Sequence, residues 1–150
     1  MVVLYGASMV TIGRSLAPFD MRLYVAPGDV LGVLAAMGEA GRAEYRLFAF
    51  ADLGFIVVYT AMFASWLKFL RVRDGLPHAL PVAIAFLPAL CDALETVGAL
   101  GLLAQYPSPE RAWVVAVSIA TPLKWAMLAG LVLLLLRGER VRWRHRDDPR

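Results

Sequence analysis

Long apolar stretches separated by short polar connections divide the chain into predicted membrane-spanning helices. A bilayer span takes about 20 apolar residues in a helix, whereas a soluble helix shows a polar face along its whole length. The apolar stretches of this chain are residues 1–17, 43–70, 76–106 and 110–136. We therefore predict an all-α, membrane-embedded four-helix bundle, followed by a polar tail at 137–150 that we expect to be frayed.

The first stretch, residues 1–17, has three interpretations. It is short for a span, and Ser15-Leu16-Ala17 has the small-residue pattern of a signal-peptide cleavage site. The first two interpretations are therefore a retained span and a signal peptide. In the third, the true start of the chain lies upstream of Met1. No Lys or Arg precedes the apolar run, and cleavage would leave Pro18 as the first residue of the mature chain. These two observations favour a retained span.

The connection at 18–42 contains a predicted short amphipathic helix. Pro27-Gly28 is typical of a turn, and Asp29 is typical of a helix N-cap. Apolar residues then recur on one face at helical spacing: Val30, Leu31, Val33, Leu34 and Met37. Gly38 and Gly41 are expected to end this helix. The pattern fits a helix lying at the membrane interface and equally a helix packed over the mouth of the bundle.

Two further features concern the ends of the spans. The second span is expected to end in a tight basic turn formed by Lys68, Arg71, Arg73, Asp74 and Gly75. Inside the third span, Pro88 is expected to kink the helix, which membrane helices tolerate.

Composition agrees with a membrane protein. The chain is 60% hydrophobic and 18% charged, against about 45–50% and 25% in soluble domains. The single cysteine, Cys91, excludes an intramolecular disulfide, a CxxC redox pair and a cysteine-rich metal site. The net charge of +3 comes from basic residues at span ends, which membrane topology explains, so we expect no nucleic-acid partner.

The distribution of basic residues predicts the orientation in the membrane. Nine follow the second or fourth span: Lys68, Arg71, Arg73, Arg137, Arg140, Arg142, Arg144, Arg146 and Arg150. Five lie on the opposite side: Arg14, Arg22, Arg42, Arg46 and Arg111. Because the side richer in Lys and Arg usually faces the cytoplasm, we predict a multi-pass protein of a bacterial inner membrane with both termini cytoplasmic.

Four ionisable residues lie inside the apolar spans: Asp52, Asp92, Glu95 and Lys124. A charge facing lipid at mid-bilayer costs about 2.5–3.5 kcal/mol on insertion scales, so we expect all four to face the bundle interior. Each lies roughly 9 to 12 residues from the outer end of its span, or about 13–18 Å down at 1.5 Å per residue. Their common depth predicts that they converge in one group, called here the ionic cluster.

Hydroxyl-bearing residues share helix faces with the ionic cluster. Thr96 follows Glu95 on the face of Asp92, and Tyr59 lies seven residues after Asp52. Ser118 and Thr121 precede Lys124 at steps of three. We predict the ionic cluster as the candidate catalytic residues. The candidate ligand-binding residues are Tyr59, Thr96, Ser118 and Thr121.

The charges of the ionic cluster do not balance, because three carboxyls face one ammonium. Asp92 and Glu95 repel each other if both ionise, so at least one carboxyl is expected to be protonated. Such a neutral acid donates or relays a proton. No metal site and no cofactor are predicted, since there are only two histidines, His78 and His145, and Lys124 disfavours a hard cation among the acids.

Three segments of the chain resemble a family of small, uncharacterised bacterial integral membrane proteins: GEAGRAEY at 38–45, LPALCDALE at 87–95 and TPLKW at 121–125. The resemblance covers residues 19–136. It implies four membrane-spanning helices and no assigned activity. Against the family's pattern, the first span of this chain is short.

Three functions fit this sequence, and none has a known catalytic motif to support it. The first is a pocket for a lipophilic small molecule, in which Lys124 holds a polar head and Asp92 or Glu95 donates a proton, with isomerisation or cyclisation of an isoprenoid or lipid as the reaction. The second is a non-catalytic membrane scaffold or partner subunit, with the cluster as a structural element. The third is a proton-coupled conductor. Membrane lipid is an expected partner, and a homo-oligomer is compatible with the sequence.

Overall fold

The computed structural model describes residue 19, residues 22–74 and residues 82–146. All regular structure in these ranges is helical, which confirms the all-α prediction. The helices are α2 (Val30–Ala36), α3 (Gly38–Asp74), α4 (Phe86–Gln105) and α5 (Arg111–Arg146), with a 3-10 helix η2 (Val82–Ala85) leading into α4.

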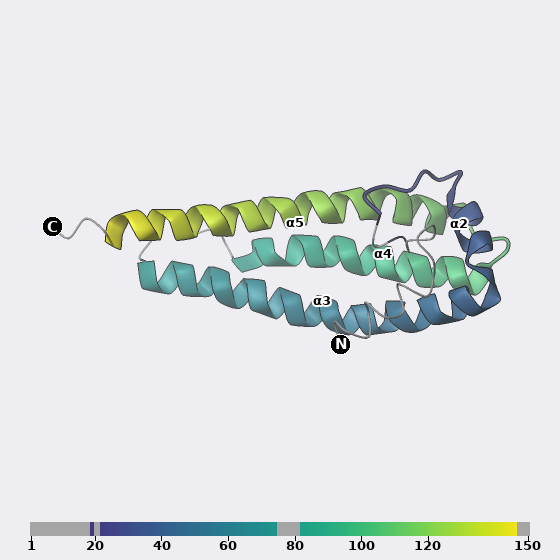
Figure 1. Ribbon diagram of the computed structural model, residues 1–150, viewed down its shortest axis with the longest axis horizontal. Helices are drawn as coiled ribbons and strands as arrows, with labels where there is room; N and C mark the ends of the chain where they lie inside the picture. The colour runs from purple at the N-terminus through teal and green to yellow at the C-terminus, as the bar shows by residue number, and fades with distance from the viewer. Residues whose placement is uncertain (1–18, 20–21, 75–81, 147–150) are drawn as a thin grey trace.

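Helices α3, α4 and α5 form an elongated bundle (Figure 1). Helix α4 packs against both of the others and runs antiparallel to them, while α3 and α5 run in the same direction. We call the end that holds α2 and the α4–α5 connection the mouth. The opposite end, where α3 and α5 finish, is called the basic end.

Three helical segments of the described residues are long and apolar enough to cross a membrane: Gly38–Leu70, Ala83–Gln105 and Arg111–Arg140. They correspond to the predicted spans 43–70, 76–106 and 110–136. The predicted first span, 1–17, lies outside the described residues, so four spans remain a prediction.

The amphipathic helix predicted after Asp29 is α2, and it covers the mouth of the bundle. Val30, Val33 and Leu34 are buried in one apolar cluster with residues of α4 and α5, including Leu102. Asp29 occupies the N-cap position but makes no side-chain capping bond. Of the predicted apolar face, Leu31 is 43% exposed, so its assignment to the buried face was wrong. Its neighbours at positions 30, 33 and 34 already fill the contact with the bundle.

The break between α2 and α3 lies at Gly38, which has a φ of 65°. A glycine adopts this left-handed conformation readily and commonly follows the last residue of a helix. The prediction that Gly41 also helps to end the amphipathic helix was wrong. Gly41 lies inside α3, which begins five residues before the predicted start at 43.

The ends of α3 and α5 differ from the sequence prediction. Lys68, Arg71 and Arg73 belong to α3, which continues to Asp74, instead of forming a turn. Helix α5 continues to Arg146, so most of the predicted frayed tail is helical. The end of an apolar run marks where the hydrocarbon core of a bilayer would end. The helix itself can continue into water, because arginine and glutamate are good helix formers.

Pro88 does not kink a long third helix, because α4 begins only two residues before it. In the first turn of a helix, the missing N–H of proline has no partner to lose. The helix type instead changes from 3-10 to α where η2 meets α4. Residues 75–81, which were assigned to the turn and to the start of the third span, lie outside the described residues.

Helices α4 and α5 approach closely at two glycines. A Cβ atom at Gly98 would lie 2.8 Å from Val117 Cγ2, and one at Gly101 would lie 2.6 Å from the Trp113 ring. Both positions therefore need a residue without a side chain. Small residues allow membrane helices to pack at short distance, and this contact fixes how α4 faces α5.

The segment before α2 runs down along the bundle from the mouth. Phe19 is fully buried, and its ring meets the Tyr45 ring edge-on, with centroids 5.9 Å apart. The Trp125 Nε1–H donates a hydrogen bond to the Arg22 carbonyl oxygen at 3.0 Å. Trp125 lies 14 residues into α5, about 21 Å along the helix axis. The segment from residue 22 to α2 therefore spans the depth between mid-bundle and mouth (Figure 1).

Candidate functional site

Asp92, Glu95 and Lys124 form a buried group that joins α4 to α5, called here the ion triad. The Lys124 ammonium lies 3.0 Å from Asp92 Oδ1 and also pairs with Glu95 Oε2. The exposed fractions are 7% for Asp92, 1% for Glu95 and 6% for Lys124. The structure thus confirms that Lys124 lies within salt-bridge distance of a carboxylate, as the common depth of these residues predicted.

Hydroxyl groups bind the remaining carboxylate oxygens of the ion triad. The Tyr59 hydroxyl of α3 donates to Asp92 Oδ2 at 2.9 Å. On α5, Thr121 Oγ1 lies 2.6 Å from Glu95 Oε1 and 2.8 Å from the Val117 carbonyl oxygen. A hydroxyl has one hydrogen, so when Thr121 donates to Val117 the Glu95 carboxyl must itself hold the proton and donate it to Thr121. The contact therefore accommodates both charge states of Glu95.

Asp52 stands beside the ion triad and makes no ion pair with a described residue. Its Oδ2 accepts a hydrogen bond of 2.9 Å from the Thr96 hydroxyl, which belongs to α4. The carboxyl is partly exposed, whereas those of Asp92 and Glu95 are buried. The four residues of the ionic cluster thus come together, but as a closed triad and one more accessible acid.

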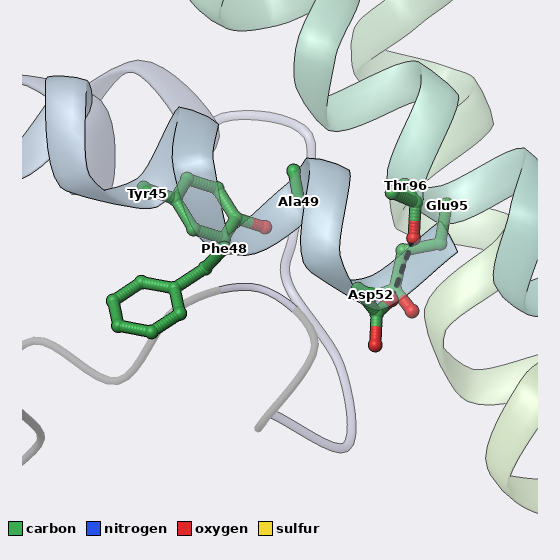
Figure 2. Close-up of a pocket in the computed structure, with 6 residues that line it drawn as sticks. All are labelled: Tyr45, Phe48, Ala49, Asp52, Glu95 and Thr96. Carbon is green, nitrogen blue, oxygen red and sulfur yellow. Dashed lines mark hydrogen bonds between the residues drawn. The ribbon is translucent and has the colours of Figure 1, made fainter. Parts of the chain in front are cut away.

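A cavity of about 10 Å³ links Asp52 to the ion triad (Figure 2). This volume holds about one water molecule. Its walls are Tyr45, Phe48, Ala49, Asp52, Glu95 and Thr96. In Figure 2 the two carboxyl groups and Thr96 lie on one side, and the rings of Tyr45 and Phe48 lie on the other. The cavity is therefore acidic at one side and aromatic at the other, and Lys124 does not reach it.

Of the four predicted ligand-binding residues, Thr96 lines the cavity, Tyr59 and Thr121 bind the ion triad instead, and Ser118 does neither. Its side chain is 5% exposed, and its Oγ has no hydrogen-bond partner among the described residues. Pro122, four residues later in α5, has no N–H to offer the Ser118 carbonyl. Ser118 is therefore a buried polar residue of α5 that does not line the Asp52 cavity.

Among the residues described, no three His, Cys, Asp or Glu side chains are grouped in a way that would hold a metal ion. The geometry of the ion triad gives the physical reason. Asp92 and Glu95 each turn one oxygen to the Lys124 ammonium, which already supplies the positive charge that a metal would bring.

Sequence reasoning missed the aromatic side of the cavity. Tyr45, Phe48, Ala49 and Asp52 are spaced by three, four and seven residues, so they fall on one face of α3. This pattern is visible once the face of Asp52 is followed towards the start of its helix. Phe19, which packs on Tyr45, gave no such signal because it lies outside the apolar spans.

The chain matches no protein-family model, no curated protein and no solved structure. The resemblance to small bacterial four-span membrane proteins therefore stays a prediction. What the site does must be argued from its geometry, which places two carboxyl groups at one small cavity and closes the single ammonium away from it.

Proposed function

We propose that this protein binds a lipophilic small molecule in the membrane, with the polar head of the molecule in the Asp52 cavity. The observation that carries this proposal is the division of the ionic cluster. Lys124, Asp92 and Glu95 satisfy one another in the interior, whereas Asp52 is more accessible and accepts a hydrogen bond from Thr96. A purely structural cluster has no need of a fourth, accessible acid beside an aromatic wall.

The dimensions of the cavity limit the ligand to one whose head alone enters. A volume of about 10 Å³ admits a single small polar group, so the apolar remainder lies outside, among the lipid-facing side chains. Asp52 and the rings of Tyr45 and Phe48 favour a head that donates hydrogen bonds or carries positive charge. In this arrangement Lys124 holds Glu95 in place and does not itself bind the head.

Proton transfer is the chemistry that this arrangement supports. Glu95 lines the cavity, and its carboxyl group also contacts the Thr121 hydroxyl. This contact accommodates the Glu95 carboxyl with or without a proton. A carboxyl of this kind acts as a general acid or base towards a group in the cavity. Isomerisation or cyclisation of an isoprenoid or lipid requires such a step.

A non-catalytic scaffold is the second candidate, and the small volume of the cavity favours it. The ion triad with Tyr59 ties all three described long helices together, which fixes their register without any ligand. A proton conductor has less support, because the interior towards the basic end is apolar. Among the described residues, the buried apolar cluster at this end consists of Leu67, Leu70, Ala85, Leu131 and Leu135.

Replacing Asp52 with Asn tests the binding proposal. Native mass spectrometry of protein extracted with its own lipids should show a co-purified molecule on the wild type, and D52N should retain it at least roughly ten-fold less, since an ionic hydrogen bond contributes about 1.5–3 kcal/mol. The matched control is Ser118→Ala, a buried polar residue outside the cavity, which should retain the molecule as the wild type does. Equal retention by D52N and wild type would refute the site.

Glu95→Gln separates catalysis from scaffolding. The amide preserves the size of the side chain and removes its acidity. If Glu95 transfers a proton, the variant should fold and hold the unconverted molecule, and mass spectrometry should detect no product. If the cluster is only structural, the bound material and the thermal melting curve should both match the wild type.

We also propose that the basic end faces the cytoplasm of a bacterial cell, with the mouth outside. The excess of Lys and Arg at the basic end supports this orientation. A reporter that is active only in the cytoplasm should be active when fused after Arg150, and inactive when inserted at Ser108 in the α4–α5 connection. The opposite pair of results would reverse the orientation.

A further inference from the structure

Helices α3 and α5 continue side by side beyond the apolar part of the bundle. The Trp66 Nε1–H of α3 donates to Glu139 Oε1 of α5 at 3.0 Å, and Leu70 packs on Gly138 so closely that a Cβ there would lie 3.1 Å from Leu70 Cδ1. Since the two helices run in the same direction, both finish at this end of the bundle, with α5 extending beyond α3 (Figure 1). The basic end is therefore a packed pair of helices.

Positive charge predominates on this helix pair. From Lys68 to the end of α3 and from Arg137 to the end of α5 there are eight basic residues and two acidic ones. The basic residues are Lys68, Arg71, Arg73, Arg137, Arg140, Arg142, Arg144 and Arg146, and the acidic ones are Asp74 and Glu139. The basic residues of this segment thus outnumber the acidic ones by six, which leaves a clear excess of positive charge.

The first basic residues lie where lipid headgroups would be. Arg137 directly follows the apolar run that ends at Leu136, and Lys68 lies two residues after Trp66, a residue type that favours the membrane interface. Lys68, Arg137 and Arg140 are exposed. On α5, positions 137 and 140 are three residues apart, so they share one face of the helix.

We propose that the basic end binds the headgroup phosphates of anionic phospholipids. An arginine guanidinium matches two phosphate oxygens at once, and the exposed Arg137 and Arg140 present two such groups on neighbouring turns of a fixed helix. Lys68 and Arg137 lie where the apolar surface of the helices ends, which is where lipid headgroups would be. Their position therefore favours a lipid as the partner over a soluble acidic molecule. This inference does not depend on the ligand proposed for the Asp52 cavity.

Lipid retention by the full-length protein tests this inference. Protein in mild detergent is mixed with equal amounts of phosphatidylglycerol and phosphatidylcholine that carry the same acyl chains, and bound lipids are counted by native mass spectrometry. The wild type should prefer phosphatidylglycerol. Arg137→Gln should weaken that preference about five-fold, and Arg137→Gln with Arg140→Gln about 25-fold, since each basic residue near the surface contributes about 1 kcal/mol.

The matched control is Arg111→Gln, which removes one exposed arginine from the same helix at the mouth. It should leave the preference unchanged. Melting curves in phosphatidylcholine alone show whether each variant is folded, and all three variants should melt like the wild type there. Equal retention of the two lipids by the wild type, or an equal effect of Arg111→Gln and Arg137→Gln, would overturn the proposal.

Discussion

Replacing Lys124 with Met should lower the free energy of unfolding of the bundle by about 3 kcal/mol. The ammonium is the partner of both Asp92 and Glu95 in the interior, and its loss leaves two neighbouring carboxyl groups without a cation. Breaking a buried ion pair on one side costs about 3–5 kcal/mol in soluble proteins, and a lipid-exposed carboxylate costs about 2.5–3.5 kcal/mol. Denaturant titration in mixed micelles, followed by tryptophan fluorescence, measures the change.

The matched control removes the whole charge set together. Lys124→Met with Asp92→Asn and Glu95→Gln keeps side chains of similar size and leaves no buried charge. Because the triple variant leaves no uncompensated charge in the interior, whereas Lys124→Met alone leaves two carboxyl groups without a cation, the triple variant should be more stable than Lys124→Met alone. A single variant as stable as the wild type, or a triple variant no better than the single, would show that Lys124 does not hold the helices together.

Alanine at both Gly98 and Gly101 should lower the free energy of unfolding by about 1–3 kcal/mol, the usual cost of overpacking. The added methyl groups would lie 2.8 Å from Val117 Cγ2 and 2.6 Å from the Trp113 ring, so α4 and α5 must move apart. The same titration measures this loss, and the wavelength of Trp113 fluorescence should shift as its surroundings loosen.

Alanine at Gly54 and Gly130 is the matched control for this pair. Both residues lie inside long helices, and beyond the neighbouring backbone of its own helix a Cβ at either position would meet nothing within 4 Å. Since alanine favours a helix over glycine by up to about 1 kcal/mol per residue, the control should be as stable as the wild type or more so. A similar loss of stability in both double variants would mean that close packing is not the cause.

The sequence predicted the parts of this fold that depend on local pattern. Apolar length located the three long helices, and the shared depth of Asp92, Glu95 and Lys124 predicted their pairing because unpaired charge is costly there. Depth alone could not separate Asp52 from the triad. That separation depends on how far α3 and α4 are rotated about their axes, which brings Thr96 to Asp52 and turns Asp92 and Glu95 towards Lys124.

Two kinds of feature were missed. Some depend on contacts between residues far apart in the sequence, and others are helix ends that do not coincide with the ends of the apolar runs. The ends of α3 and α5 were placed where the apolar runs stop, but helix formation continues through arginine-rich segments when two helices support each other, as at Trp66 and Glu139. The position of the segment before α2, along the side of the bundle, depends on a hydrogen bond from Trp125, a residue 103 positions after Arg22. No local pattern near Arg22 carries that information.

This last contact has a consequence for the biogenesis of the protein. Arg22 and Trp125 are separated by 103 positions, and a ribosome adds about 5–20 residues per second. Residue 22 is therefore synthesised about 5–20 s before the indole that binds it. Over that interval the segment cannot occupy its place along α5. Docking of Arg22 against Trp125 is thus a late event in membrane assembly, which follows the synthesis of α3 and α4.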